Sequence, residues 1–229
     1  MGKHSPISRA RWQSSQKQIL ECWKEKDLYD EQEKDKAAYL PLLQKYAENI
    51  SLDGAVLEIG CGPVCLSQAL PLENKTFLDP LLDDFRRMYP GELPDGEYLA
   101  TIAERIPKAN SSYDLIICLN TLSYALNPEL IMNEMERLLR PEGRLILAMR
   151  IHSPLESRLH YWTTHCMSAL HCGTQPNYYS LAGIQKTLAR HFTITEEVIS
   201  SSRFTWLPFF RREERLFVCT HLADKTSPL

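Results

Sequence analysis

The sequence predicts an α/β fold: a Rossmann-like three-layer sandwich around a mostly parallel, seven-stranded sheet whose last strand is antiparallel. Helices at the N-terminus precede the first strand in the chain. Two observations predict it. After residue 50, short apolar runs alternate with segments of helical periodicity, which is typical of parallel sheets covered by helices on both faces. Before residue 50 the chain is polar and helix-prone, with no strand pattern.

Two helices are expected within residues 8–49. Each has one stripe at helical spacing: Trp12, Gln16, Ile19 and Trp23 in the first, and Tyr39, Leu40, Leu43 and Tyr46 in the second. Two interpretations stay open. Trp12, Gln16 and Tyr39 face inwards from a lid over a ligand, or Trp12 and Trp23 only anchor the first helix to the sheet. We therefore divide the chain into an N-terminal helical extension or lid (1–50) and a main domain (51–229).

The strands are expected at residues 55–59, 76–78, 98–100, 115–119, 144–148, 194–199 and 215–221. Asn127 and Pro128 predict the start of a helix that Arg140–Gly143 ends. Further helices are expected from Ser153-Pro154, a capping box, and over residues 179–190. Since the linker 200–214 is too short for a crossover helix, the last two strands should be antiparallel.

Composition excludes several classes of function. A length of 229 residues with 24% charged residues suits a single globular unit. A net charge of −3 gives no general attraction to a nucleic-acid backbone. No apolar run is long enough to cross a bilayer and no secretory signal is visible, so we expect a cytoplasmic protein. The seven cysteines lack zinc-ligand spacing, so we expect reduced thiols and no metal.

The stretch VLEIGCGPVCLSQAL, residues 56–70, contains a Gly-x-Gly turn after the first strand, and a helix is expected to follow. Such a turn lets backbone N–H groups approach a nucleotide. A dinucleotide fingerprint needs a third glycine where this chain has Cys65. Glu58 precedes Gly60 by two residues, where an acid is poorly placed against a pyrophosphate but well placed towards an ammonium. The pattern favours S-adenosylmethionine over a nicotinamide dinucleotide.

From Ala55 to Met149 the chain resembles the Rossmann-like class I S-adenosylmethionine-dependent methyltransferases, whose first motif is an acidic residue, x, Gly-x-Gly. The resemblance implies that S-adenosylmethionine is the cofactor, that Asp79 holds the ribose, that residues 102–104 contact adenine, and that Leu119-Asn120 lies beside the cofactor. The implied cofactor-binding residues are Glu58, Gly60, Cys61, Gly62, Asp79, Pro80, Ile102, Ala103, Glu104, Leu119 and Asn120. Many relatives carry Asp where this chain has Ile102, so backbone groups would contact the adenine amino group here.

Methyl transfer from a sulfonium is an in-line displacement that mainly requires positioning, although a hydroxyl acceptor benefits from a general base. Ligands of open α/β sheets bind at the carboxyl ends of the strands. His152, after the fifth strand, is the first candidate base. The alternative is that His152 has no catalytic role and simply precedes the helix cap at Ser153. Tyr124 is the second candidate and His160 the third.

The acceptor elements are expected at residues 150–180 and 200–214. The second contains Phe204, Trp206, Phe209 and Phe210, which form either part of an apolar acceptor pocket or a small packed cluster.

We therefore expect methyl transfer to a small-molecule acceptor, at oxygen in a sugar or secondary metabolite. The sequences GCGPV and DPLLDDF and the helix that carries Trp12 are most similar to bacterial small-molecule and sugar methyltransferases. A quinone, lipid precursor or protein is the alternative acceptor. A nicotinamide-dependent oxidoreductase is disfavoured by Glu58 and Val64. A protein that binds S-adenosylmethionine without catalysis is the alternative from another class.

Overall fold

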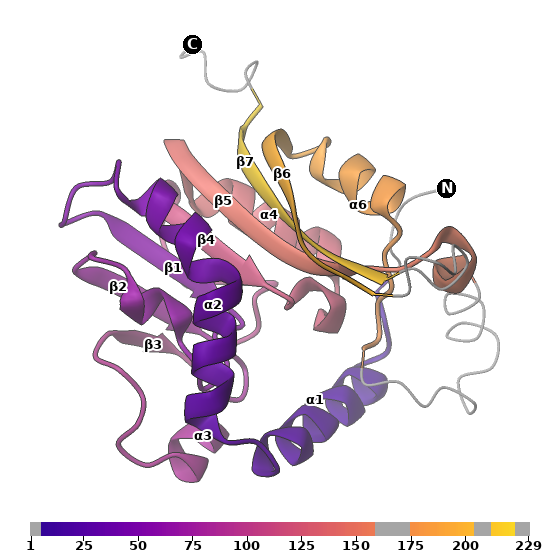
Figure 1. Ribbon diagram of the computed structural model, residues 1–229, viewed down its shortest axis with the longest axis horizontal. Coiled ribbons are helices and arrows are strands. Elements are labelled where there is room, and N and C mark those ends of the chain that lie inside the picture. The colour runs from indigo at the N-terminus through magenta and orange to yellow at the C-terminus, as the bar shows by residue number, and fades with distance from the viewer. Residues whose placement is uncertain (1–5, 159–174, 204–211, 223–229) are drawn as a thin grey trace.

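A single seven-stranded sheet forms the centre of the computed structural model, which describes residues 6–158, 175–203 and 212–222 (Figure 1). The strand order is β3-β2-β1-β4-β5-β7-β6. The strands are β1 Ala55–Ile59, β2 Asn74–Leu78, β3 Glu97–Leu99, β4 Tyr113–Leu119, β5 Leu139–Ile151, β6 Phe192–Arg203 and β7 Arg212–His221. Only β7 runs antiparallel to its neighbours, β5 and β6. The predicted fold class is confirmed.

Helices cover both faces of this sheet (Figure 1). The helices of the described residues are α1 Arg9–Lys24, α2 Leu28–Ala47, α3 Leu82–Met88, α4 Pro128–Leu138 and α6 Leu181–Leu188, with short 3₁₀ helices η1 Leu66–Ala69 and η2 Leu122–Tyr124. The side chain of Asn127 caps α4 by accepting from the backbone N–H of Glu129, and Pro128 occupies the first turn, as predicted. The helix ends at Leu138, before the expected stop, and residues 140–143 belong to β5, where they interrupt the pairing with β4.

The prediction of a helix directly after the glycine turn is wrong, because only the four-residue 3₁₀ helix η1 follows the turn. Two backbone constraints explain the difference. Cys65 has a φ of 47° in the left-handed region, which a regular helix cannot include. Leu70 precedes Pro71 and is extended, with ψ 146°, because proline disfavours the helical conformation of the residue before it.

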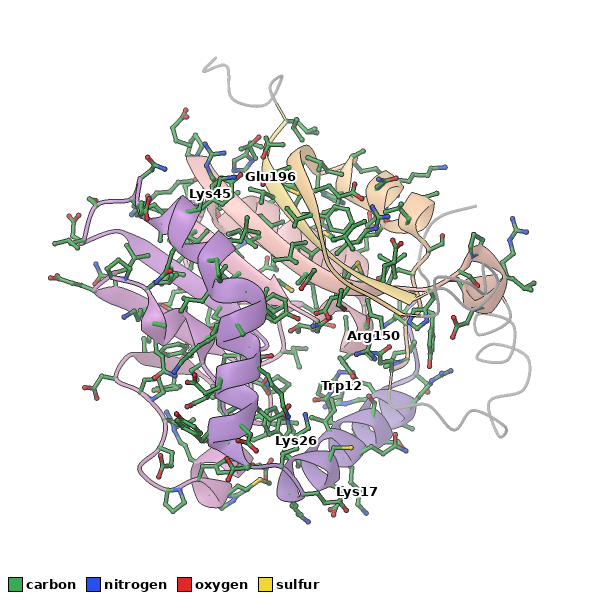
Figure 2. The ribbon with its side chains drawn as sticks, viewed as in Figure 1. Trp12, Lys17, Lys26, Lys45, Arg150 and Glu196 are labelled. Carbon is green, nitrogen blue, oxygen red and sulfur yellow. The ribbon has the colours of Figure 1, made fainter. Side chains whose placement is uncertain are left out.

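Helix α2 contributes to the core of the main domain. Its residues Tyr39, Leu43 and Ala47 are buried in the same hydrophobic cluster as Val56 of β1 and Leu115 of β4. At its end, Lys45 Nζ lies 2.7 Å from Glu196 Oε2 on β6 (Figure 2). The opposite face of the sheet packs against α4 and α6. The second half of the N-terminal extension is therefore an integral layer of the sandwich.

Helix α1 lies apart from the sheet, across the carboxyl ends of the strands (Figure 1). Both of its ends are tied down. The backbone N–H of Ile7 donates to Leu126 O at 3.1 Å, and Tyr89 OH donates to Trp23 O at 2.8 Å. Trp23 also meets Phe85 of α3 edge-on, with ring centroids 6.1 Å apart. These contacts hold α1 as a bridge between the start of α4 and α3.

The place of α2 in the core predicts a large cost for Leu43→Ala. Leu43 is completely buried, so its truncation should reduce the free energy of unfolding by about 2–5 kcal/mol through lost burial and a cavity. Leu52, which is 65% exposed, supplies the matched control, whose Ala variant should change it by less than about 0.5 kcal/mol. Urea unfolding measures both, and equal effects would show that α2 is a separable extension.

Candidate active site

A pocket of about 450 Å³ opens between the carboxyl ends of β1, β2, β4 and β5 and the helices α1 and α2. Its size is that of a site for a small molecule or cofactor. Trp12 and Gln16 of α1 line it from one side, and Tyr39 of α2 from another. The inward-facing interpretation of these three residues is therefore correct. Trp23 lines the same pocket while it also anchors α1.

The glycine turn after β1 forms one wall of the pocket. Gly60 and Gly62 have φ values of 69° and 54°, a conformation that residues with a Cβ rarely adopt. A Cβ on Gly60 would lie 2.1 Å from Thr121 Oγ1. The backbone N–H of Gly60 donates to Leu78 O at 2.7 Å. The turn is thus packed against the end of β4 on one side and bonded to the end of β2 on the other.

Glu58 lies behind this turn and does not line the pocket. Its carboxylate accepts from the backbone N–H groups of Leu66 at 3.0 Å and Ser67 at 2.8 Å, and from Ser67 Oγ at 2.6 Å. Burial raises the pKa of Glu58 to about 7, while these donors act in the opposite direction. The expectation that Glu58 contacts an ammonium group directly is therefore corrected. Its carboxylate instead holds the loop that forms the pocket wall.

Asp79, at the end of β2, combines burial with an open face towards the pocket. Its Oδ2 accepts from Gly62 N at 3.1 Å and its Oδ1 from Leu81 N at 2.8 Å. Burial raises the pKa of Asp79 to about 6. Each carboxylate oxygen has a second lone pair, so Asp79 can still accept from two vicinal hydroxyls. This arrangement fits the ribose of S-adenosylmethionine.

The other predicted cofactor residues converge on the same pocket. Gly60, Cys61, Gly62, Pro80, Ile102, Ala103, Glu104, Leu119 and Asn120 all line it. Glu104 also fastens the loop before α4, because its Oε1 accepts from the backbone N–H groups of Leu126 and Asn127 at 2.8 and 2.9 Å. Ile102 and Ala103 give an apolar lining suited to the adenine ring.

The three candidate bases differ in position. Tyr124 lines the pocket, and its hydroxyl accepts from Gln175 Nε2 at 3.3 Å. His152 is buried outside the lining, with its ring edge-on to Tyr178 at 4.8 Å and its Nδ1 3.4 Å from Glu156 Oε2. The expectation that His152 reaches the acceptor is therefore corrected. His160 and the aromatic residues of 204–210 lie outside the described residues.

Sequence reasoning missed the acidic end of the pocket. Tyr39 OH donates to the carboxylate of Glu214 on β7, and Asn120 Nδ2 donates to Glu214 Oε1 at 2.8 Å. Asp35 lines the pocket beside them, and burial together with the charges of Glu31 and Glu214 raises its pKa to about 6. The sequence carries no signal for Glu214, because it stands between Glu213 and Arg215 in a charged run and the helix that meets it lies 175 residues earlier in the chain.

Similarity to known proteins agrees with this geometry. Residues 57–147 match a family model described as a methyltransferase domain. No curated protein matches the chain. A candidate methyltransferase from Bacillus halodurans has a TM-score of 0.62 at 14% identity, with 80% of this chain and 98% of the other covered.

Two further solved structures are similar. A SAM-dependent methyltransferase from Methanosarcina mazei has a TM-score of 0.58 at 17% identity, with 80% and 97% of the two chains covered. A geranyl diphosphate methyltransferase, solved in complex with SAM, has a TM-score of 0.57 at 12% identity, with 80% and 84% covered. At these identities the likeness is one of fold.

The domain match spans β1 to β5, the strands that carry the glycine turn, Asp79 and Asn120. The matched residues form a methyltransferase domain, and the solved structures share its fold. Within the described residues, no group of His, Cys, Asp or Glu could hold a metal ion. None of the helices in the described ranges has the length and apolarity that a bilayer crossing requires.

The contact between Gly60 and Thr121 predicts a specific cost for Gly60→Ala. Left-handed backbone strain should cost about 1–2 kcal/mol, and the overlap with Thr121 a further ~1–3 kcal/mol. Gly91 is a matched control, because its φ is 81° but a Cβ there meets nothing within 4 Å. Gly91→Ala should therefore show the strain alone. Urea unfolding compares the two, and equal losses would mean that the turn does not press on β4.

Proposed function

We propose that the enzyme transfers the methyl group to an oxygen of a small-molecule acceptor, with a sugar or secondary metabolite as the class. The supporting observation is the polar end of the pocket: Asp35, Tyr124 and Glu214 line it beyond the cofactor residues. Hydroxyl acceptors need such hydrogen-bonding groups for orientation. Helix α1, tied at both ends, covers this region and supports a small acceptor.

In this proposal the pocket residues have separate roles towards the cofactor. Asp79 accepts from the ribose hydroxyls, Ile102 and Ala103 enclose the adenine, and the backbone of Gly60–Gly62 lies along the amino-acid portion. Glu58 acts through the loop that it fastens. When bound, S-adenosylmethionine supplies a methyl group activated by a sulfonium. The protein's contribution is to hold the acceptor oxygen in line with it and to exclude water.

A proton must leave a hydroxyl acceptor, and two pocket groups suit that task. Asp35 has a pKa raised to about 6, so it is ionised at pH 7 yet close to the working pH, as an efficient general base requires. Tyr124, in η2 after β4, can orient the hydroxyl. We assign Asp35 as the base and Tyr124 as the orienting group. The net charge of −3 supports a partner other than nucleic acid, and we retain a cytoplasmic location.

The role of Asp79 predicts a selective loss of cofactor affinity. In calorimetric titration with S-adenosylhomocysteine, Asp79→Ala should weaken binding by about 100-fold, because two hydrogen bonds to a charged group disappear. Asp83→Ala is the control and should leave affinity unchanged, since that side chain is 67% exposed on α3. Saturable binding of NAD without any response to S-adenosylhomocysteine would overturn the proposal.

A further inference from the structure

Among the described residues that line the pocket, one basic side chain forms no ion pair. Of the lining residues that the structure describes, Lys26 and Arg150 are the basic ones. Lys26 Nζ lies 2.7 Å from Glu31 Oε2 and is therefore neutralised. The side chain of Arg150 forms no hydrogen bond or ion pair with another residue within the described ranges 6–158, 175–203 and 212–222. Figure 2 shows Arg150 near the end of β5, with Trp12 of α1 close by.

The strand register explains why Arg150 keeps its charge available. Arg150 of β5 is paired with Glu214 of β7, and directly opposed residues of antiparallel strands have side chains on the same face. The carboxylate of Glu214 is instead hydrogen-bonded to Tyr39 and Asn120. Glu213 of β7 and Glu197 of β6 form their ion pairs with Arg215 and not with Arg150. The expected partner of Arg150 is thus engaged elsewhere.

Strand order separates Arg150 from the proposed ribose site. The sheet runs β2-β1-β4-β5 between the strand ends that carry Asp79 and Arg150. Neighbouring strands are about 4.8 Å apart, so these two strand ends lie roughly 14 Å from each other. The guanidinium therefore belongs to the end of the pocket that also holds Tyr124 and Glu214.

We infer that Arg150 binds an anionic group of the acceptor, a carboxylate or a phosphate, so that the acceptor is an acidic small molecule with a hydroxyl group. A planar guanidinium at the end of a strand matches such a group with two parallel hydrogen bonds. Asp35 of α2 then faces the hydroxyl, while the Glu214 carboxylate stays bonded to Tyr39 and Asn120. This inference rests on the proposed function, since it places the acceptor in the same pocket.

The test uses benzoate and benzamide as a pair of probes of equal shape and different charge, titrated by saturation-transfer NMR into the protein loaded with S-adenosylhomocysteine. Benzoate should bind at least about tenfold more tightly than benzamide. Arg150→Gln should abolish that difference. Lys17→Gln, which removes an exposed charge from α1 outside the pocket lining (Figure 2), should preserve it.

Each other outcome overturns the inference in a recognisable way. Equal binding of the two probes, or no binding of benzoate, would show that Arg150 does not select anions. A tenfold weaker affinity of Arg150→Gln for S-adenosylhomocysteine itself would assign Arg150 to the carboxylate of the cofactor. Failure of the unaltered protein to bind S-adenosylhomocysteine would instead overturn the proposed function, and the inference with it.

Discussion

The pocket depends on how the turn after β1 is held in place. No regular helix follows the turn, so Glu58 anchors it from behind through the N–H groups of Leu66 and Ser67. From the front, Asp79 accepts from Gly62 N, and Thr121 packs against Gly60. Carboxylates from β1 and β2 and a side chain after β4 therefore fix one short loop. Buried carboxylates are costly unless hydrogen-bonded, and here that cost is offset by donors that also define the wall of the site.

The N-terminal helices complete the pocket in two different ways. Helix α2 is a layer of the core, and its Tyr39 reaches Glu214 and Asn120 at the strand ends. Helix α1 is hydrogen-bonded to the rest of the molecule near both of its ends, and Trp12 and Gln16 between them line the pocket. One helix therefore positions polar groups on the pocket floor, while the other covers them. Together the two helices turn an open sheet edge into a pocket.

Local signals in the sequence predicted most of the fold, and all but one of the residues that the resemblance assigns to the cofactor line one pocket. Strand runs, the cap at Asn127 and the spacing of Gly60, Gly62 and Asp79 depend on near neighbours, and the structure contains them all. The acceptor side depends on contacts between distant segments. The position of Arg150 opposite Glu214 follows from the register of β5 with β7, and no periodicity reveals which of two strand-end residues faces a pocket.

A crystal structure with S-adenosylhomocysteine tests the central claim most directly, namely that the glycine turn, Asp79 and α1 together enclose the methyl donor. The account predicts the ribose hydroxyls within hydrogen-bond distance of the Asp79 carboxylate and the sulfur facing Asn120, with Glu58 still bound to Leu66 and Ser67. A ligand bound elsewhere on the molecule, or a ribose held by groups other than Asp79, would contradict it.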